Sequence, residues 1–179
     1  MIAYLIRHPA PMGAGGLCYG RTDLEVAPEE VARVAGLVRA QLEGGVDRWV
    51  SSPLTRCVAL ADALAPTFTI DDRLVELDFG AWEGRPWDDL DSGEIEAWSR
   101  DVVHRSPPGG ETWEELRARA SSFMADLGSE PGAVGIIAHA GVIRAIVAQV
   151  LGGPLVGTWH LRIPFGHVLA LDLPGDPDV

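Results

Sequence analysis

Two histidines and two arginines follow apolar stretches of the sequence, and together they could bind and attack a phosphate group. His8 comes directly after Arg7 at the end of the apolar run Ile2 to Ile6, and Arg56 and His139 follow two further apolar runs. A buried histidine beside an arginine is costly unless an anion neutralises the pair, and guanidinium groups bind phosphate oxygens through paired hydrogen bonds. The pattern therefore predicts a phosphate site.

His8 is the candidate nucleophile of this site. A neutral imidazole nitrogen can attack phosphorus when the N–H of its other ring nitrogen is held by an acceptor. Arg7 and Arg56 would hold the non-bridging oxygens, and a cationic His139 would add a donor as charge shifts in the transition state. A single histidine at a strand end is more often structural, so the prediction depends on the four residues together.

Release of an alkyl alcohol also requires a proton donor, and three acids compete for that role in one Gly-punctuated stretch. A carboxyl group beside a bound phosphate is favoured in its protonated form by the like charge. We assign the role to Glu76, because its surroundings in the sequence are apolar and a carboxylate has no evident structural use there. Asp78 and Glu83 are interpreted as solvent-facing.

The composition narrows the classes of partner and chemistry. The formal net charge of −12 repels nucleic acid and anionic membranes, so neither is an expected partner, and a small phosphorylated substrate requires a concentrated positive cluster. All 14 basic residues are arginine, and the sequence contains neither lysine nor asparagine. Chemistry that depends on a phosphate-loop lysine or on a lysine Schiff base is therefore excluded.

Cysteine content and hydropathy suggest a cytoplasmic protein. Cys18 and Cys57 are too few for a disulfide framework and lack the spacing of metal ligands. No stretch reaches the roughly 20 apolar residues of a membrane span, and a signal peptide is not recognisable. We therefore expect reduced thiols and no metal or other cofactor. The length fits one domain over residues 1–179, and the sequence defines no oligomeric state.

Strand-like and helix-like segments alternate along the chain, which predicts an α/β fold. Apolar runs of strand length occur at Ile2 to Ile6, Arg48 to Ser51, Thr67 to Ile70, Val134 to Ala138 and Val168 to Leu173. Helices are expected at Pro28 to Glu43, from a Ser52-Pro53 cap to about Leu64, after a Thr112–Glu115 capping box, and from His139 to Gly152. The alternation predicts a three-layer sandwich, with helices on both faces of a largely parallel sheet. Ligands of such sheets bind at the carboxyl ends of the strands, where Arg7, His8 and His139 lie.

Residues 85–110 form an acidic excursion that contains Trp87 and Trp98. Two interpretations stay open for it: a cap over the phosphate site, or a solvated helix anchored by the two tryptophans. The tail over residues 174–179 is expected to fray.

Six short motifs occur in one order along the chain. They are Leu5 to Pro9, Ser51 to Arg56, Glu76 to Gly80, Trp82 to Gly84, Pro108 to Thr112 and His139 to Arg144. In this set and order the chain resembles the histidine phosphatase superfamily, which has the phosphoglycerate mutase-like fold. The resemblance implies a metal-independent phosphomonoester hydrolase. In it His8 is transiently phosphorylated, Arg7, Arg56 and His139 complete the phosphate pocket, and Glu76 gives and then takes the proton.

The stretch Gly16 to Asp23 and the short length resemble the alpha-ribazole phosphatase branch, which works late in cobalamin biosynthesis. Within this stretch Tyr19 and Arg21 are candidate contacts to the leaving group, and an ion pair between Arg21 and Asp23 is the equal alternative. Two positions depart from the family pattern. Pro9 replaces the usual glycine after the nucleophile, and the family's asparagine a few residues further on is absent. We expect the phosphatase step to survive both changes.

Other functions are compatible with parts of this pattern. A sugar-phosphate or phosphoglycerate mutase would need added segments that trap the intermediate, and a phosphohistidine protein phosphatase would need less capping than residues 85–110 provide. A non-catalytic phosphate-binding protein would keep the fold without turnover, although all five chemical residues are present. A dinucleotide site after the first strand is excluded, because Cys18 stands where the third glycine belongs.

Overall fold

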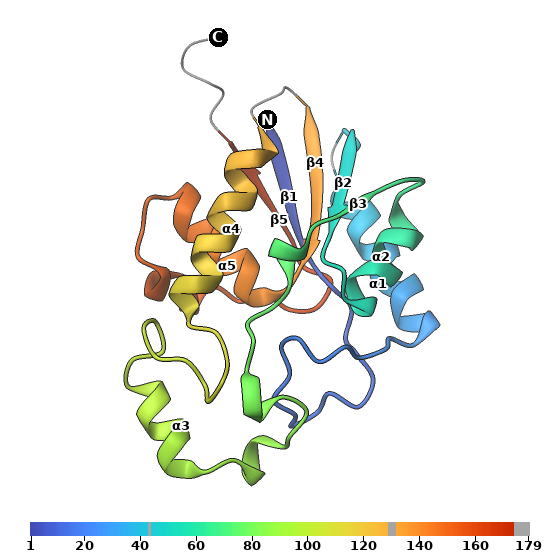
Figure 1. Ribbon diagram of the computed structural model, residues 1–179. Helices are drawn as coiled ribbons and strands as arrows, with labels where there is room; N and C mark the ends of the chain where they lie inside the picture. The colour runs from blue at the N-terminus through green and yellow to red at the C-terminus, as the bar shows by residue number, and fades with distance from the viewer. Residues whose placement is uncertain (43, 129–131, 174–179) are drawn as a thin grey trace.

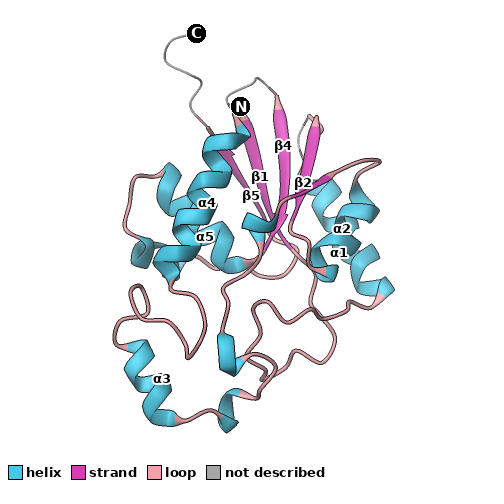
Figure 2. Cartoon of the chain, in the orientation of Figure 1, coloured by secondary structure: helices cyan, strands magenta, loops and turns pink. Residues whose placement is uncertain are grey.

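The computed structural model describes residues 1–42, 44–128 and 132–173, and within them the chain forms one five-stranded sheet (Figure 2). The strands are β1 (Ile2–Arg7), β2 (Arg48–Ser51), β3 (Thr69–Ile70), β4 (Ala133–Ala138) and β5 (Val168–Asp172). Their order in the sheet is β3-β2-β4-β1-β5, and β5 is the antiparallel member of the described strands. The predicted strands and the largely parallel sheet are confirmed, although β3 is shorter than expected.

Both faces of the sheet are buried, which explains why the central strands have continuous apolar sequences instead of alternating ones. In β1, Ala3 and Leu5 pack into one layer of helices, and Tyr4 and Ile6 pack into the other. All four side chains are at most 4% exposed. Because successive strand residues point to opposite faces, the sheet contributes to two hydrophobic cores at once.

Helices cover each face of the sheet in pairs (Figure 1). On one side lie α1 (Pro28–Gln41) and α2 (Thr55–Leu64), and on the other lie α4 (Trp113–Leu127) and α5 (Ala140–Val150). The predicted three-layer sandwich is confirmed. Helix α5 has the largest share of buried residues among the described helices, as its apolar sequence predicts.

The start of α4 is fixed by the predicted capping box. The hydroxyl of Thr112 accepts a hydrogen bond from the N–H of Glu115 at 3.1 Å, and the Glu115 carboxylate accepts one from the N–H of Thr112 at 2.8 Å. These bonds satisfy two N–H groups that have no partner within the helix. They also fix the position of Trp113, the first helical residue.

The start of α2 differs from the prediction that Ser52 caps it. The N-cap residue is Leu54, which has no side-chain capping bond, and the hydroxyl of Ser52 instead contacts His139. Asp23, from a distant loop, accepts hydrogen bonds from the N–H and the hydroxyl of Thr55 at 2.8 and 2.6 Å. A tertiary contact therefore replaces the local cap.

The excursion over residues 85–110 lies beyond the carboxyl ends of the strands and contains α3 (Ser92–Ser99) (Figure 1). Trp87 and Trp98 both pack edge-on against Phe79, with ring centroids 5.8 and 6.2 Å apart. The anchoring by two tryptophans is confirmed, and the role of the excursion as a cap stays a prediction.

Both ends of the described chain meet at the opposite edge of the sheet. The N–H of Leu173 donates to the carbonyl of Met1 at 2.9 Å. The tail that was predicted to fray, residues 174–179, lies outside the described residues. None of the described helices is long and apolar enough to cross a membrane.

Candidate active site

His8 and His139 lie side by side at the carboxyl ends of the neighbouring strands β1 and β4. The strands pair in register, with Arg7 opposite Ala138, and the N–H of His8 donates to the carbonyl of Ala138 at 3.1 Å. The next residue on each strand is a histidine, and the two ring centroids are 4.9 Å apart. This distance matches the spacing of about 4.8 Å between adjacent strands, so strand pairing brings the rings together.

The ring of His8 is held in one tautomer. Its side chain is buried, and Nδ1 lies 2.6 Å from the carbonyl oxygen of Pro9. A carbonyl only accepts, so Nδ1 carries the proton and the lone pair of the neutral ring is on Nε2. Burial, followed by the charge of Arg56, holds the pKa of His8 well below its usual value of 6.5. Proline in place of glycine therefore keeps the carbonyl that orients the ring.

The ring of His139 is fully buried and is held from the opposite side. Its Nε2 lies 2.8 Å from the hydroxyl oxygen of Ser52, and its Nδ1 is one of the buried atoms without a hydrogen-bond partner in the described chain. Burial, followed by the charges of His8 and Arg56, lowers the pKa of His139 well below its usual value. The ring is therefore neutral at physiological pH unless an anion is added beside it.

Arg7 is held by the turn that leads into β5. One of its amino nitrogens donates to the carbonyl of Ile163 at 2.5 Å, and its Cζ atom lies 4.0 Å from the ring centroid of Phe165. The Phe165 ring is also 5.4 Å from that of His8. Burial lowers the pKa of Arg7, and the charge of Glu76 opposes this effect.

Arg56 is completely buried in the first turn of α2. Its two amino nitrogens donate to the carbonyls of Thr22 and Gly20 at 2.8 and 2.5 Å. Its Cζ atom lies 5.4 Å from the ring centroid of Tyr19. Burial raises the pKa of Tyr19, while the charges of Arg7 and Arg56 act in the opposite direction. Tyr19 therefore lies beside Arg56, and its role as a contact to the leaving group stays a prediction.

Unsatisfied nitrogens converge around His8. Among the described residues, four buried side-chain polar atoms lack a partner: Nε of Arg7, Nε of Arg56, Nδ1 of His139 and Nε1 of Trp98. Buried polar groups in native proteins are nearly always hydrogen-bonded, so each exception requires an explanation. Three of the four belong to the predicted phosphate pocket, and an anion would satisfy them.

The carboxylate of Glu76 faces the start of α5. It accepts a hydrogen bond from the N–H of Gly141 at 3.0 Å, and a Cβ atom at position 141 would lie 2.1 Å from it, so a larger residue there would displace the carboxylate. Arg119 donates to the backbone carbonyl of Glu76 at 3.1 Å. The charge of this carboxylate acts on both Arg7 and Arg144. Glu76 thus lies beside the histidine and arginine cluster, as predicted.

Arg21 is not part of that cluster. Its side chain is 47% exposed, its Nε lies 3.6 Å from the carboxylate of Asp78, and an amino nitrogen lies 4.0 Å from Glu111. Of the two alternatives for Arg21, the ion pair with Asp23 is wrong, because Asp23 binds the start of α2 instead, and a contact with the leaving group stays a prediction. Asp78 is partly buried and accepts from a backbone N–H, so its interpretation as a solvent-facing acid is also wrong.

The interpretation of Glu83 as solvent-facing is wrong. Its side chain is half-buried and binds several backbone N–H groups of a neighbouring loop. Its carboxylate accepts bonds of 2.9–3.1 Å from the backbone N–H groups of Gly20, Arg21, Thr22 and Phe79. Burial opposes its ionisation, but these bonds and one from the Thr22 hydroxyl outweigh burial and lower the pKa of Glu83. Through this loop Glu83 positions the two carbonyls that hold Arg56.

We expect Glu83→Gln to lower the free energy of unfolding at pH 7 by about 1–3 kcal/mol, because the amide leaves buried N–H groups unsatisfied. The folded pKa of Glu83 is lowered, so the wild-type advantage is present above about pH 4.3 and is lost as the pH falls through the folded value. Urea unfolding over a pH series measures both effects. Glu29→Gln, at an exposed residue of α1, is the matched control and is expected to change stability by less than about 0.5 kcal/mol. Equal effects of the two substitutions would contradict the assignment.

Ser52 and Phe165 are site residues that the sequence did not identify. The signal for Ser52 was its position directly after a strand, but that position also suits a helix cap. Phe165 carries no local signal, because the chain reversal into β5 brings it against Arg7 and His8.

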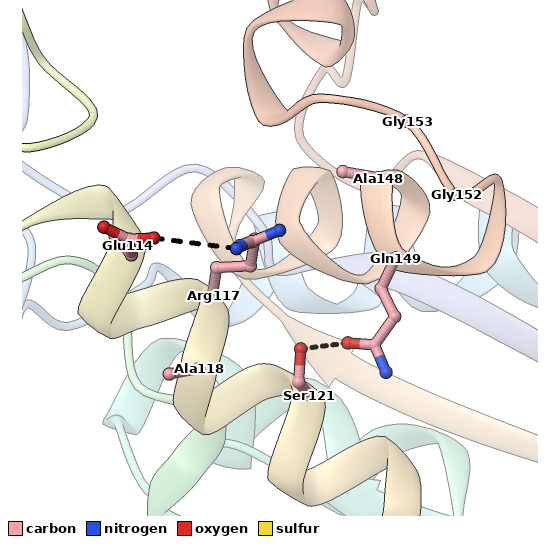
Figure 3. Close-up of a pocket in the computed structure, with 8 residues that line it drawn as sticks. All are labelled: Glu114, Arg117, Ala118, Ser121, Ala148, Gln149, Gly152 and Gly153. Atoms are coloured by element: carbon pink, nitrogen blue, oxygen red, sulfur yellow. Dashed lines mark hydrogen bonds and ion pairs between the residues drawn. The ribbon is translucent and has the colours of Figure 1, made fainter.

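A cavity of about 480 Å³ lies elsewhere, between α4 and the end of α5 (Figure 3). Its lining includes Ser121 and Gln149, which hydrogen-bond to each other, and Glu114 and Arg117, which form an ion pair of 3.7 Å. None of the clustered histidines and arginines lines it. Its polar groups are paired with each other, so it lacks the unsatisfied donors of the site around His8.

The fold, the buried histidine pair at the carboxyl edge of the sheet and the family match define the class of protein, which is an α/β phosphatase. The chain belongs to the histidine phosphatase superfamily (branch 1), whose family model matches residues 3–177. The predicted family, the phosphoglycerate mutase-like fold and the phosphatase activity are confirmed.

Several relatives share most of their length with the chain. The alpha-ribazole phosphatase of Shigella flexneri superposes with a TM-score of 0.86 at 28% identity, over 96% of this chain and 90% of that one. A Hydrogenobacter thermophilus protein named as a phosphoserine phosphatase is 29% identical over 97% of this chain and 90% of its own. The adenosylcobalamin/alpha-ribazole phosphatase of Escherichia coli K12 is 31% identical over 66% of this chain and 61% of its own. These relatives share the reaction class and differ in the substrate that they are named for.

Proposed function

We propose that this protein hydrolyses a small phosphomonoester through a phosphohistidine on His8, with alpha-ribazole phosphate as the candidate substrate. One observation supports this proposal above all. The ring of His8 is neutral and is oriented through Nδ1, and buried nitrogens of Arg7, Arg56 and His139 without hydrogen-bond partners belong to the same cluster. The similarity to alpha-ribazole phosphatases over 96% of the chain supports the choice of substrate.

In the first half-reaction, Nε2 of His8 attacks phosphorus and the bond from phosphorus to the leaving oxygen breaks. The protonated carboxyl group of Glu76 gives its proton to that oxygen, so the alcohol leaves neutral. Arg7 and Arg56 bind the non-bridging oxygens and withdraw charge that would repel the nucleophile. The negative phosphate favours proton uptake by His139, which then donates to it.

In the second half-reaction, water attacks the phosphorus of phosphohistidine. The carboxylate of Glu76 takes the proton of that water, the bond between Nε2 and phosphorus breaks, and inorganic phosphate leaves. His8 returns to its neutral form. The hydrogen bond from the N–H of Gly141 keeps the carboxylate in place through both steps.

In this proposal arginine side chains supply the positive charge that binds the phosphate, and no metal takes part. The described residues contain no group of three or more acids, histidines or cysteines that could hold a metal ion. A cytoplasmic location belongs to the same proposal, and it fits Cys18 and Cys57, which are both buried and unpaired.

We expect the protein to release phosphate from 4-nitrophenyl phosphate in the presence of EDTA, and to retain activity at mildly acidic pH. The lowered pKa of His8 keeps the nucleophile neutral until the pH falls well below 6.5. Values of kcat/KM for alpha-ribazole phosphate, phosphoserine, 3-phosphoglycerate and a phosphohistidine peptide identify the substrate class. Loss of activity with EDTA, or isomerisation of 3-phosphoglycerate without phosphate release, would contradict the proposal.

A further inference from the structure

We infer that a second pocket, beside the phosphate site, binds a planar aromatic ring carried by the leaving group of the substrate. This tryptophan pocket is lined by Trp98, Val102, Trp113, Arg144 and Trp159 and has a volume of about 270 Å³. The inference rests on the proposed function, because the ring is placed relative to a phosphate bound at His8.

The aromatic walls come from three separate elements. Trp98 belongs to α3, Trp113 begins α4, and Trp159 lies in the 3-10 helix Leu155–His160. The rings of Trp113 and Trp159 are 6.4 Å apart and tilted by 62°. Indole faces stack well on planar rings. The volume is below the roughly 300–1000 Å³ of sites for whole drug-sized ligands, so the pocket suits one ring system.

The pocket retains unused binding capacity. Trp159 is 41% exposed although it lies next to another tryptophan, so its indole surface is accessible to a solute. Three tryptophans and an arginine around one small space fit a flat ring better than a polar sugar or an amino acid.

Arg144 joins this pocket to the catalytic cluster. It follows His139 by five positions, which corresponds to about 7.5 Å along the axis of α5. Its guanidinium donates to the carbonyls of Ala140 and Leu161, both at 3.2 Å. Burial lowers the pKa of Arg144, and the charge of Glu76 opposes this effect, so the arginine lies within electrostatic range of the proposed acid.

One short segment, residues 159–165, also forms a wall of both sites. Along it, Trp159 lines the tryptophan pocket, Leu161 accepts from Arg144, Ile163 accepts from Arg7, and Phe165 contacts Arg7 and His8. Six residues of chain span at most about 20 Å. The phosphate and the ring are therefore close enough to belong to one small molecule.

The two sites and the lining of the pocket restrict the class of ligand. A phosphate at His8 and a ring in the tryptophan pocket must be joined by a spacer that fits within the span of residues 159–165, which is at most about 20 Å. The guanidinium of Arg144 excludes a cationic ring and favours one with acceptor atoms at its edge. The ligand is thus a phosphomonoester whose alcohol carries a flat ring, and a nucleotide-like sugar phosphate is an ester of this class. Phosphoserine and phosphoglycerate have no ring to fill the space.

The test compares kcat/KM for alpha-ribazole 5′-phosphate with that for ribose 5-phosphate, which lacks the ring. We expect the wild type to prefer the ring-bearing ester by about tenfold or more, and Trp159→Ala to lower this preference about fivefold through KM, because ring stacking on an aromatic side chain is lost. Val156→Ala is the matched control, because Val156 lies in the same 3-10 helix, is 44% exposed and does not line the pocket. Equal wild-type activity on both esters, or an equal loss on both in Trp159→Ala, would overturn the inference.

A binding measurement separates this inference from the proposed function. Alpha-ribazole without its phosphate is expected to quench the tryptophan fluorescence of the wild type and to bind Trp159→Ala at least about fivefold more weakly. If the protein releases no phosphate but this difference is found, the proposed function fails and the tryptophan pocket stands. If phosphate is released and both proteins bind the nucleoside equally, the pocket assignment fails alone.

Discussion

Replacing His8 with alanine is expected to reduce phosphate release from 4-nitrophenyl phosphate by a factor on the order of 10⁴ or more, because the covalent route is removed. The remaining arginines still bind phosphate but offer no nucleophile. His104→Ala is the matched control, since His104 is an exposed histidine that pairs with Asp101 and lies outside the site. Its activity is expected to equal that of the wild type. Urea unfolding of His8→Ala shows whether the buried substitution preserves the fold.

The same substitution allows a direct test of the intermediate. Wild-type protein that is mixed briefly with ³²P-labelled substrate and denatured in alkali is expected to carry label that is released by acid, which is the behaviour of a phosphoramidate bond. His8→Ala is expected to carry none. Retained activity in this substitution, or label on a residue other than His8, would end the case for His8 as the nucleophile.

Glu76→Gln is expected to lower kcat/KM for an alkyl phosphate by about 10²–10⁴, and to leave kcat/KM for 4-nitrophenyl phosphate within about tenfold of the wild type. A nitrophenolate ion can leave without being protonated, whereas an alkyl alcohol leaves only when its oxygen receives a proton. The ratio of kcat/KM reports the first half-reaction, so slower hydrolysis of phosphohistidine does not obscure it. The amide oxygen still accepts from the N–H of Gly141, which keeps the side chain in place.

Asp78→Asn is the matched control for Glu76→Gln. Asp78 lies in the same stretch, is partly buried and contacts Arg21, but it does not border the helix start that holds Glu76. It is expected to lower activity on both esters equally or not at all. Two results would contradict the assignment of Glu76 as the acid. One is a loss of activity confined to alkyl esters in Asp78→Asn, and the other is an equal loss on alkyl and nitrophenyl esters in Glu76→Gln.

The fold could be predicted where local sequence alone determines structure. The capping box at Thr112 and Glu115 involves residues three positions apart, and its geometry is as predicted. Ser52 shows where this reasoning fails. A serine after a strand can cap the next helix or reach a distant partner, and His139, 87 positions along the chain, decides between them. Only the assembled sheet brings that partner into range.

The dependence on distant partners also explains which site residues could be placed from the sequence and which could not. His8 and His139 could be placed together because the carboxyl ends of parallel strands share one edge. From the sequence, Glu83 was expected to face solvent. Arg21 was expected to contact the leaving group or to pair with its neighbour Asp23. In the structure Glu83 binds a loop about 60 positions earlier, and Arg21 turns towards Asp78. Loop partners of this kind leave no periodic pattern in the sequence, unlike residues at the ends of paired strands.

The pairing of β1 with β4 determines how this protein can change over evolutionary time. Backbone hydrogen bonds between the two strands set the spacing of positions 8 and 139, and the Pro9 carbonyl and the Ser52 hydroxyl then orient the two rings. Substitutions of core residues such as Leu5 and Ile136 by apolar types of similar volume can therefore alter thermal stability while the strands keep His8 and His139 at the same spacing. A more thermostable form could accordingly be engineered by rebuilding the interior, without any retuning of the chemistry.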